Sequence, residues 1–207
     1  MPARLRPTAP IAADAILVGD PGRALMLAQE LLAEPKMSNH ARGLWGYTGV
    51  TEAGAQLTIQ ATGMGGPSAS VVLADLAELG VRRAIRIGTC ASLGELNLGD
   101  LLVVDEARDG VRPDERLTDA LRAALPGAHL GAVLSLDSLY RPERDLPSTL
   151  AEAADMQTAA LLAAAAELGV AAAAVLVVTE KSDSGQLPDE ELVAAAKVAG
   201  RAAADVL

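Results

Sequence analysis

An arginine lies inside an apolar run that otherwise has the character of a buried strand. Residues 83–90 read Arg-Ala-Ile-Arg-Ile-Gly-Thr-Cys, and such a run predicts a strand of a parallel sheet. A guanidinium in that strand is costly unless it is paired, so we expect either an internal carboxylate or a bound anion beside Arg86. Thr89 and the amides after Gly88 add donors at the carboxyl end of the strand, where open α/β sheets bind ligands. The pattern predicts an oxyanion site, with phosphate as the favoured anion.

A second group of possible anion ligands follows the apolar residues 15–18, in the sequence Gly19-Asp-Pro-Gly-Arg23. Glycines let the backbone approach a ligand, and the start of the next helix attracts an anion. An ordinary strand–helix turn with a solvated Arg23 explains this segment equally well. No Gly-Lys-Ser/Thr follows, so the segment is not a P-loop.

Further polar clusters follow other expected strands, at 62–68, 136–140, 155–157 and 179–183. The glycines of 62–68 do not have the spacing of a dinucleotide-binding fingerprint. Because carboxyl ends of parallel strands meet at one edge of a sheet, we expect these clusters to converge on one site.

Hydrophobic periodicity and turn residues predict alternating strands and helices. We expect a loose lead-in over 1–14 and a polar segment without a regular pattern over 36–46. The expected strands are 15–18, 47–51, 57–62, a strand starting at 83, 99–105, 131–135 and a last strand at 172–178. One expected helix starts at 21. The others span 67–79, about 115–124, a region that ends at 168, and 188–207, with a further short helix within 141–153.

Composition limits the classes of protein that fit. The 207 residues carry a net charge of −10, which argues against general affinity for nucleic acid or anionic membranes. No apolar run approaches the ~18 residues that span a bilayer, and no signal pattern opens the chain. A single cysteine fits a reducing compartment. We expect one α/β domain over 1–207 and a cytoplasmic location.

Five motifs, in order along most of the chain, resemble the purine nucleoside phosphorylase and uridine phosphorylase family of the hexameric bacterial type. They are Gly-Asp-Pro-Gly-Arg-Ala at 19–24, Arg-Gly-Leu-Trp-Gly-Tyr-Thr-Gly at 42–49, Gly-Met-Gly-Gly-Pro-Ser at 63–68, Ile-Arg-Ile-Gly-Thr-Cys at 85–90 and Asp-Met-Gln-Thr at 155–158.

The resemblance implies a three-layer α/β/α fold with a mixed, partly barrel-like central sheet. It implies that phosphate is bound by Gly19, Arg23, Arg86 and Thr89, with Arg42 reaching in from a neighbouring subunit. The active unit would then be a homo-oligomer, at least a dimer and up to a hexamer. Inorganic phosphate is the expected co-substrate, with no cofactor and no metal.

The same resemblance assigns the nucleoside-binding residues. Met64 and Met156 would line the sugar, and Ala91, Leu139 and Tyr140 would face the base.

The motif at 155–158 and the loop after the last strand supply the remaining candidates. Asp155 is grouped with the nucleoside ligands, although an aspartate at a helix start is also a common cap. Gln157 stands where the family has a glutamate that binds the ribose hydroxyls, and a neutral amide accepts hydrogen bonds more weakly. Either Asp183 or Glu180 would be the carboxyl group that assists the departing base.

The expected reaction is phosphorolysis of a purine or pyrimidine nucleoside to free base and pentose 1-phosphate, with Arg86 as a catalytic residue. Arginines that position a phosphate dianion next to a sugar cation provide both orientation and electrostatic stabilisation. Two alternatives remain: a nucleosidase of the same superfamily that uses water, and a non-catalytic relative that binds a nucleoside, phosphate or a partner.

Overall fold

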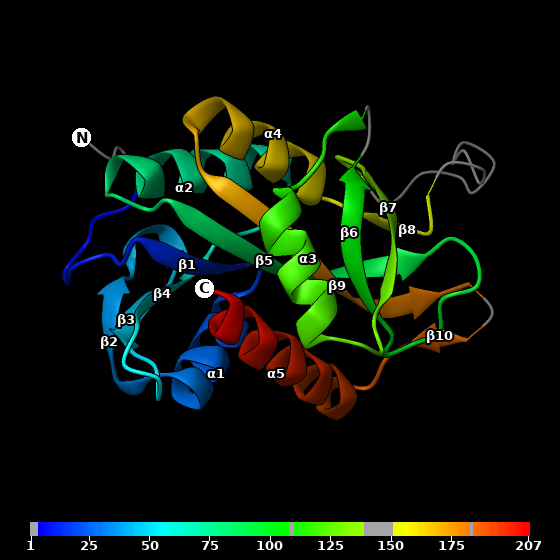
Figure 1. Ribbon diagram of the computed structural model, residues 1–207, viewed down its shortest axis with the longest axis horizontal. Helices are drawn as coiled ribbons and strands as arrows, with labels where there is room; N and C mark the ends of the chain where they lie inside the picture. Colours follow the sequence, from blue (N-terminus) through cyan, green and yellow to red (C-terminus); the bar gives the residue numbers. More distant parts are fainter. Residues whose placement is uncertain (1–3, 108–109, 139–150, 183) are drawn as a thin grey trace.

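A computed structural model describes residues 4–107, 110–138, 151–182 and 184–207 (Figure 1). Its strands are β1 (Asp14–Val18), β2 (Ala33–Asn39), β3 (Gly46–Val50), β4 (Gln56–Ala61), β5 (Arg83–Ser92), β6 (Leu101–Ala107), β7 (His129–Ser135), β8 (Ala153–Asp155), β9 (Ala171–Lys181) and β10 (Gly185–Gln186). Its helices are α1 (Pro21–Leu31), α2 (Gly66–Glu78), α3 (Glu115–Ala124), α4 (Thr158–Leu168) and α5 (Asp189–Val206), with a short 3-10 turn η1 (Ala41–Gly43).

The strands form one mixed sheet in the order β10-β9-β6-β7-β8-β5-β1-β4-β3-β2. Strand β5 also pairs with β9, and β9 pairs with β6, so β5, β9, β6, β7 and β8 close into a barrel. Strands β1 and β4 extend from the barrel, and β4, β1, β5 and β9 are mutually parallel. Their carboxyl ends therefore lie at the same edge, as expected for a ligand site.

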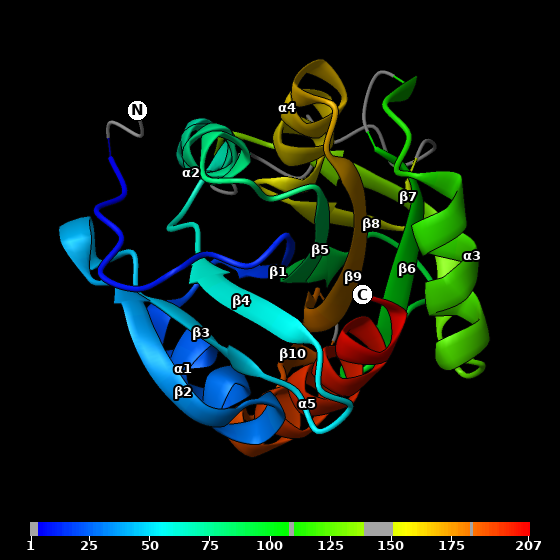
Figure 2. The same cartoon turned by 60° about the vertical axis from the view of Figure 1, so that its left-hand side comes forward.

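Helices cover both faces of the sheet, which confirms the three-layer arrangement and the mixed, barrel-like sheet. Helices α2 and α4 pack together on one face, and α1, α3 and α5 lie on the other (Figure 2). Strand alternation directs Ile85 and Ile87 towards α1, α3 and α5, whereas Ala84 and Cys90 join the core beneath α2 and α4. Arg86 is two residues after Ala84 in β5, so its side chain points to the same face of the sheet, the one covered by α4.

Several sequence predictions of secondary structure were wrong in detail. The segment after α1 contains an edge strand, β2, whose polar residues gave no apolar alternation and whose pairing with β3 has two register shifts. The expected last strand does not end at 178: β9 continues to Lys181, and β10 pairs back onto it. The short strand β8 also went unpredicted, because three residues are too few for a period. The short helix expected within 141–153 falls mostly outside the described residues.

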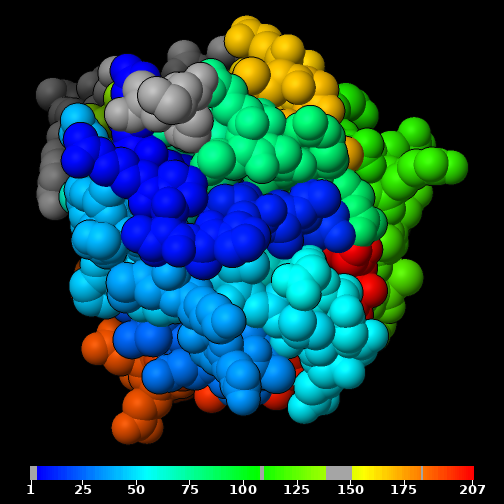
Figure 3. All heavy atoms as spheres, turned by 90° about the vertical axis from the view of Figure 1, so that its left-hand side faces the viewer, coloured from blue at the N-terminus to red at the C-terminus, as the bar shows by residue number. Residues whose placement is uncertain are grey.

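The expectation of a loose start was also wrong for residues 4–13. The backbone amides of Arg4 and Leu5 donate to the Asp75 carboxylate on α2, and Leu5 is buried. Farther along, the Thr8 amide donates to the Ser38 carbonyl of β2. Figure 3 shows this segment as a band between α2 and the strands β2 to β4. The segment thus joins the helical layer to the sheet edge.

In the part of the chain that the structure describes, no helix combines the length and apolar character needed to cross a membrane.

Candidate active site

A cavity of about 200 Å³ opens at the carboxyl ends of the parallel strands. Five separate segments contribute to it: the β1–α1 turn, the β4–α2 turn, the end of β5, the β8–α4 junction and the end of β9. The lining residues are Gly19, Arg23, Gly63, Met64, Gly65, Arg86, Gly88, Thr89, Cys90, Ala91, Ala154, Asp155, Met156, Gln157, Thr179 and Glu180. Five of the six predicted polar clusters therefore contribute to one cavity, whereas no described residue of the 136–140 cluster lines it.

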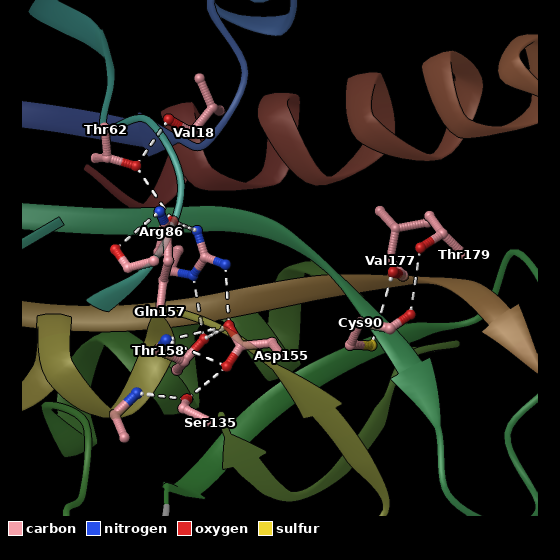
Figure 4. Close-up of polar contacts among 12 residues, drawn as sticks. Val18, Thr62, Arg86, Cys90, Ser135, Asp155, Gln157, Thr158, Val177 and Thr179 are labelled. Atoms are coloured by element: carbon pink, nitrogen blue, oxygen red, sulfur yellow. Dashed lines mark hydrogen bonds and ion pairs between the residues drawn. The ribbon is translucent and has the colours of Figure 1, made fainter. Parts of the chain in front are cut away.

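Arg86 is the central charge of this cavity, and it is only 4% exposed. Its Nη2 donates to Asp155 Oδ2 at 2.9 Å, its Nη1 to Gln157 Oε1 at 2.8 Å and its Nε to Thr158 Oγ1 at 3.1 Å (Figure 4). The internal carboxylate expected beside Arg86 is thus Asp155. A guanidinium has five N–H donors, so two remain beyond these three bonds to described residues. Arg86 lines the cavity, so these two are the donors that a bound anion could use.

Gly88 is glycine because the Arg86 side chain passes directly over it. A Cβ at this position would lie 2.5 Å from Arg86 Nη2 and 2.8 Å from Leu176 Cδ2. Distances this short are not tolerated between nonbonded heavy atoms, and the guanidinium would have to move. The absence of a side chain at Gly88 therefore allows the Arg86 guanidinium to occupy its position.

Arg23 brings a second cation to the same cavity from the first turn of α1. Its backbone amide donates to the Asp20 side chain, which caps the helix. Burial lowers the pKa of Arg23, the Asp20 carboxylate acts in the opposite direction, and the Arg86 charge lowers it further. Among the described residues Arg23 has no ion-pair partner. Two arginines at one partly buried cavity, each beside a carboxylate, give it a local positive charge that would attract an anion.

Asp155 anchors Arg86 through a network of hydroxyl and amide donors. Its carboxylate accepts from the Thr158 hydroxyl and amide, and from the Ser135 hydroxyl at 2.5 Å. The Ser135 oxygen in turn accepts from the amide of Ala159 in the first turn of α4. A buried ion pair is favourable only when further hydrogen bonds satisfy it, and here they do. The network fixes the β8–α4 junction to the end of β7.

Gln157 connects Arg86 to the turn between β4 and α2. Its Oε1 accepts from Arg86 and lies 3.2 Å from the Thr62 hydroxyl, which also donates to the Val18 carbonyl at 3.0 Å. Its Nε2 donates to the carbonyl of Gly63 at 2.6 Å and reaches that of Gly65 at 3.3 Å.

The far wall of the cavity is built by a bulge between β5 and β9. Cys90 pairs with Val178 but Ala91 pairs with Glu180, which leaves Thr179 as the extra residue. The Thr179 hydroxyl donates to the Cys90 carbonyl at 3.3 Å. The bulge allows Glu180, an exposed residue, to line the cavity. Burial, with the Asp155 charge adding to it, raises the pKa of the Cys90 thiol to about 12, so this thiol stays protonated.

The remaining predicted residues are distributed as follows. Gly19, Thr89, Ala91 and Met156 line the cavity, as does Met64, which is 87% exposed on its turn. Arg42 is exposed, does not line the cavity, and has a left-handed backbone with φ of +60°. Leu139, Tyr140 and Asp183 lie outside the described residues. The binding roles of all these residues remain predictions.

Sequence reasoning missed Ser135 and Thr158, the two hydroxyls that hold Asp155. Thr158 was visible in the Asp-Met-Gln-Thr motif, but its role depends on the register between β5 and β8. Ser135 ends an ordinary apolar strand, and nothing in the sequence distinguishes it.

The described residues contain no group of three or more His, Cys, Asp or Glu side chains that could hold a metal ion. The site instead combines two arginines, glycine-lined backbone and a carboxylate at the rim. That combination is what an α/β protein with an anion site at the strand ends would require.

Comparisons with known proteins identify the family. The model of the phosphorylase superfamily matches residues 14–207, and the chain belongs to that superfamily. A DeoD-type purine nucleoside phosphorylase from Oceanobacillus iheyensis is 33% identical over 201 residues, covering 85% of each chain. A protein of the same description from Bacillus cereus matches equally well.

Solved structures agree on the fold. A uridine phosphorylase from Vibrio fischeri superposes with a TM-score of 0.85 at 21% identity, covering 95% of this chain and 92% of the other. A second structure of that enzyme, in complex with 6-hydroxy-1-naphthoic acid, gives a TM-score of 0.83 at 22% identity. The chain has the nucleoside phosphorylase fold.

Proposed function

We propose that this protein is a nucleoside phosphorylase that converts a purine or pyrimidine nucleoside and inorganic phosphate into free base and pentose 1-phosphate. The observation that carries the proposal is the pair of cavity cations, Arg23 and Arg86, of which Arg23 has no ion-pair partner among the described residues. Membership of the phosphorylase superfamily agrees with it. Hydrolysis by water would not require such a pair.

The mechanism follows from what the two arginines do to phosphate. The free Arg86 donors, Arg23 and Thr89 would hold the dianion against the strand ends, with Gly19 backbone close by. Held there, one phosphate oxygen attacks the anomeric carbon of the sugar as the bond to the base breaks. The sugar becomes cationic in the transition state, and the fixed dianion stabilises that charge. The carbon–oxygen bond that forms gives pentose 1-phosphate.

The departing base takes the bonding electron pair and needs a proton or a hydrogen bond. Glu180 at the cavity rim and Asp183 are the two candidate donors. Glu180→Gln and Asp183→Asn distinguish them: the variant that removes the donor should lower kcat for nucleosides with poor leaving groups while leaving the KM for phosphate unchanged.

Several finer features belong to the same proposal. Arg42 would complete the phosphate site of a neighbouring subunit, because it is exposed and does not line its own cavity. The active unit would be a homo-oligomer, the location cytoplasmic and the physiological role nucleoside salvage. No cofactor beyond inorganic phosphate is needed for the chemistry above.

The direct test is a panel of inosine, adenosine and uridine assayed with and without phosphate. The proposal expects base release that requires phosphate. Release that is independent of phosphate would indicate a nucleosidase, and retention of nucleoside binding without turnover would indicate a non-catalytic relative.

A further inference from the structure

The carboxamide of Gln157 is 3% exposed and surrounded by protein partners of both kinds. Its oxygen accepts from the Arg86 guanidinium at 2.8 Å and lies 3.2 Å from the Thr62 hydroxyl, whose single proton is shared with the nearer Val18 carbonyl. Its nitrogen donates to the Gly63 carbonyl at 2.6 Å and lies 3.3 Å from that of Gly65. The strongest contacts of both amide atoms are therefore with the protein.

These neighbours also determine which way the amide points. Exchanging oxygen and nitrogen would place an N–H against the Arg86 guanidinium and an oxygen 2.6 Å from the Gly63 carbonyl. Both contacts would be repulsive, so the assignment follows from the network. A carboxylate at this position would face the same Gly63 oxygen without a hydrogen to share. The site is built for an amide.

The groups joined by Gln157 belong to different elements that line the cavity. Arg86 lies on β5, whereas Gly63 and Gly65 belong to the β4–α2 turn and carry the exposed Met64 between them. Gly63 and Gly65 have positive φ angles of +74° and +81°, a conformation that glycine adopts without strain. The Gly65 carbonyl also accepts from the Ala69 amide of α2, whereas the Gly63 carbonyl accepts from the Gln157 amide at 2.6 Å.

We propose that Gln157 is a positioning residue that ties the phosphate-binding Arg86 to the Met64 turn, rather than a ligand of the sugar hydroxyls. This inference rests on the proposed function, and it assigns to residue 157 a task different from the sugar contact that the family resemblance predicts. Two consequences follow. Loss of the amide should weaken phosphate binding through Arg86, and it should affect ribonucleosides and 2′-deoxyribonucleosides equally.

The experiment follows the logic of a double-mutant cycle. One change removes the Gln157 amide from the protein, and the other removes the 2′-hydroxyl from the substrate. Wild type, Gln157→Ala and Gln157→Asn are assayed with a ribonucleoside and its 2′-deoxy counterpart over a range of phosphate concentrations. Gln56→Ala, an exposed glutamine at the start of β4, is the matched control and should behave like wild type.

The expected result is a KM for phosphate raised at least tenfold in Gln157→Ala. The ratio of kcat/KM for ribonucleoside over 2′-deoxyribonucleoside should stay within twofold of the wild-type ratio. Gln157→Asn keeps an amide but is one methylene too short to span the gap, so it should resemble Gln157→Ala. An unchanged KM for phosphate overturns the proposal. A fall of more than threefold in the substrate ratio also overturns it, because it would show contact with the 2′-hydroxyl.

Two further measurements keep the test decisive. If Gln157→Ala fails to fold, Thr62→Val removes one partner of the amide oxygen and should raise the KM for phosphate about two- to fivefold; no change contradicts the link. If wild type turns over no nucleoside, the proposed function fails, and the link is then judged by the rise in melting temperature with inorganic phosphate. A smaller rise in Gln157→Ala than in wild type supports the link, and an equal or absent rise overturns it.

Discussion

Replacing Arg23 by glutamine should change stability in opposite directions with and without phosphate. Arg23 is partly buried, is repelled by Arg86 and has no ion-pair partner among the described residues. Removing that charge relieves the desolvation cost and the repulsion by Arg86, which together outweigh the lost attraction to Asp20, because the net effect lowers the pKa of Arg23. Gains of this kind are worth about 0.5–1 kcal/mol. For a chain of this size, 1 kcal/mol corresponds to roughly 2–4 °C in melting temperature. Without phosphate, Arg23→Gln should melt about 1–4 °C above wild type.

With phosphate the order should reverse. A hydrogen bond to a charged group contributes about 1.5–3 kcal/mol, so losing Arg23 weakens phosphate binding roughly 10- to 100-fold. At a phosphate concentration about 100 times the wild-type Kd, binding stabilises wild type by about 2.7 kcal/mol but the variant by only about 0.4–1.4 kcal/mol. The gain in melting temperature should therefore be at least halved.

The assay is thermal unfolding over a phosphate titration, with chloride at the same ionic strength as reference. Arg116→Gln is the control, since Arg116 is exposed on α3 and does not line the cavity; its curve should follow that of wild type. The reasoning is refuted if Arg23→Gln is less stable than wild type without phosphate, or if it keeps the full phosphate-dependent shift.

Three further predictions concern groups around Arg86. Gly88→Ala should displace the guanidinium and lower stability by about 1–3 kcal/mol in urea unfolding, with loss of the phosphate-dependent shift; wild-type behaviour would show that the cavity is looser than described. Ser135→Ala should lower stability by about 1–2 kcal/mol, because Asp155 and the start of α4 each lose a partner; an unchanged urea midpoint would argue against this network. The raised pKa of Cys90 means that the fold favours the neutral thiol. Its contribution to stability is complete below the ordinary pKa of 9.0 and is lost progressively as the pH rises towards about 12. Alkylation by iodoacetamide at pH 8 should therefore be slow in the folded protein and fast in urea; equal rates would contradict the burial.

The sequence predicted several of the strands that carry the site because their signals are local. Apolar runs with turn residues after them identified β1, β5 and β7, and periodicity placed α3 at its observed bounds. Strands β2 and β8 were missed for physical reasons: β2 is a polar edge strand, and β8 has three residues. Their existence depends on pairing with distant partners.

The site was predictable as a set of segments but not as a set of contacts. An arginine in a buried strand requires a counterion, and that requirement identified Arg86 as the centre of the site. The choice of Asp155 as its partner depends on β8 running antiparallel to the end of β5, which no local pattern encodes. The same holds for Gln157, whose sequence position suggests a ligand and whose contacts make it a link.

The central claim is that the Arg86 cavity holds phosphate as a reactant. The most direct test is the stoichiometry of turnover, with free base, inorganic phosphate and pentose 1-phosphate quantified together during cleavage of a nucleoside that the panel identifies as a substrate. We expect one phosphate to be consumed and one pentose 1-phosphate to be formed for each base released. Base release accompanied by free pentose, with phosphate unchanged, would contradict it.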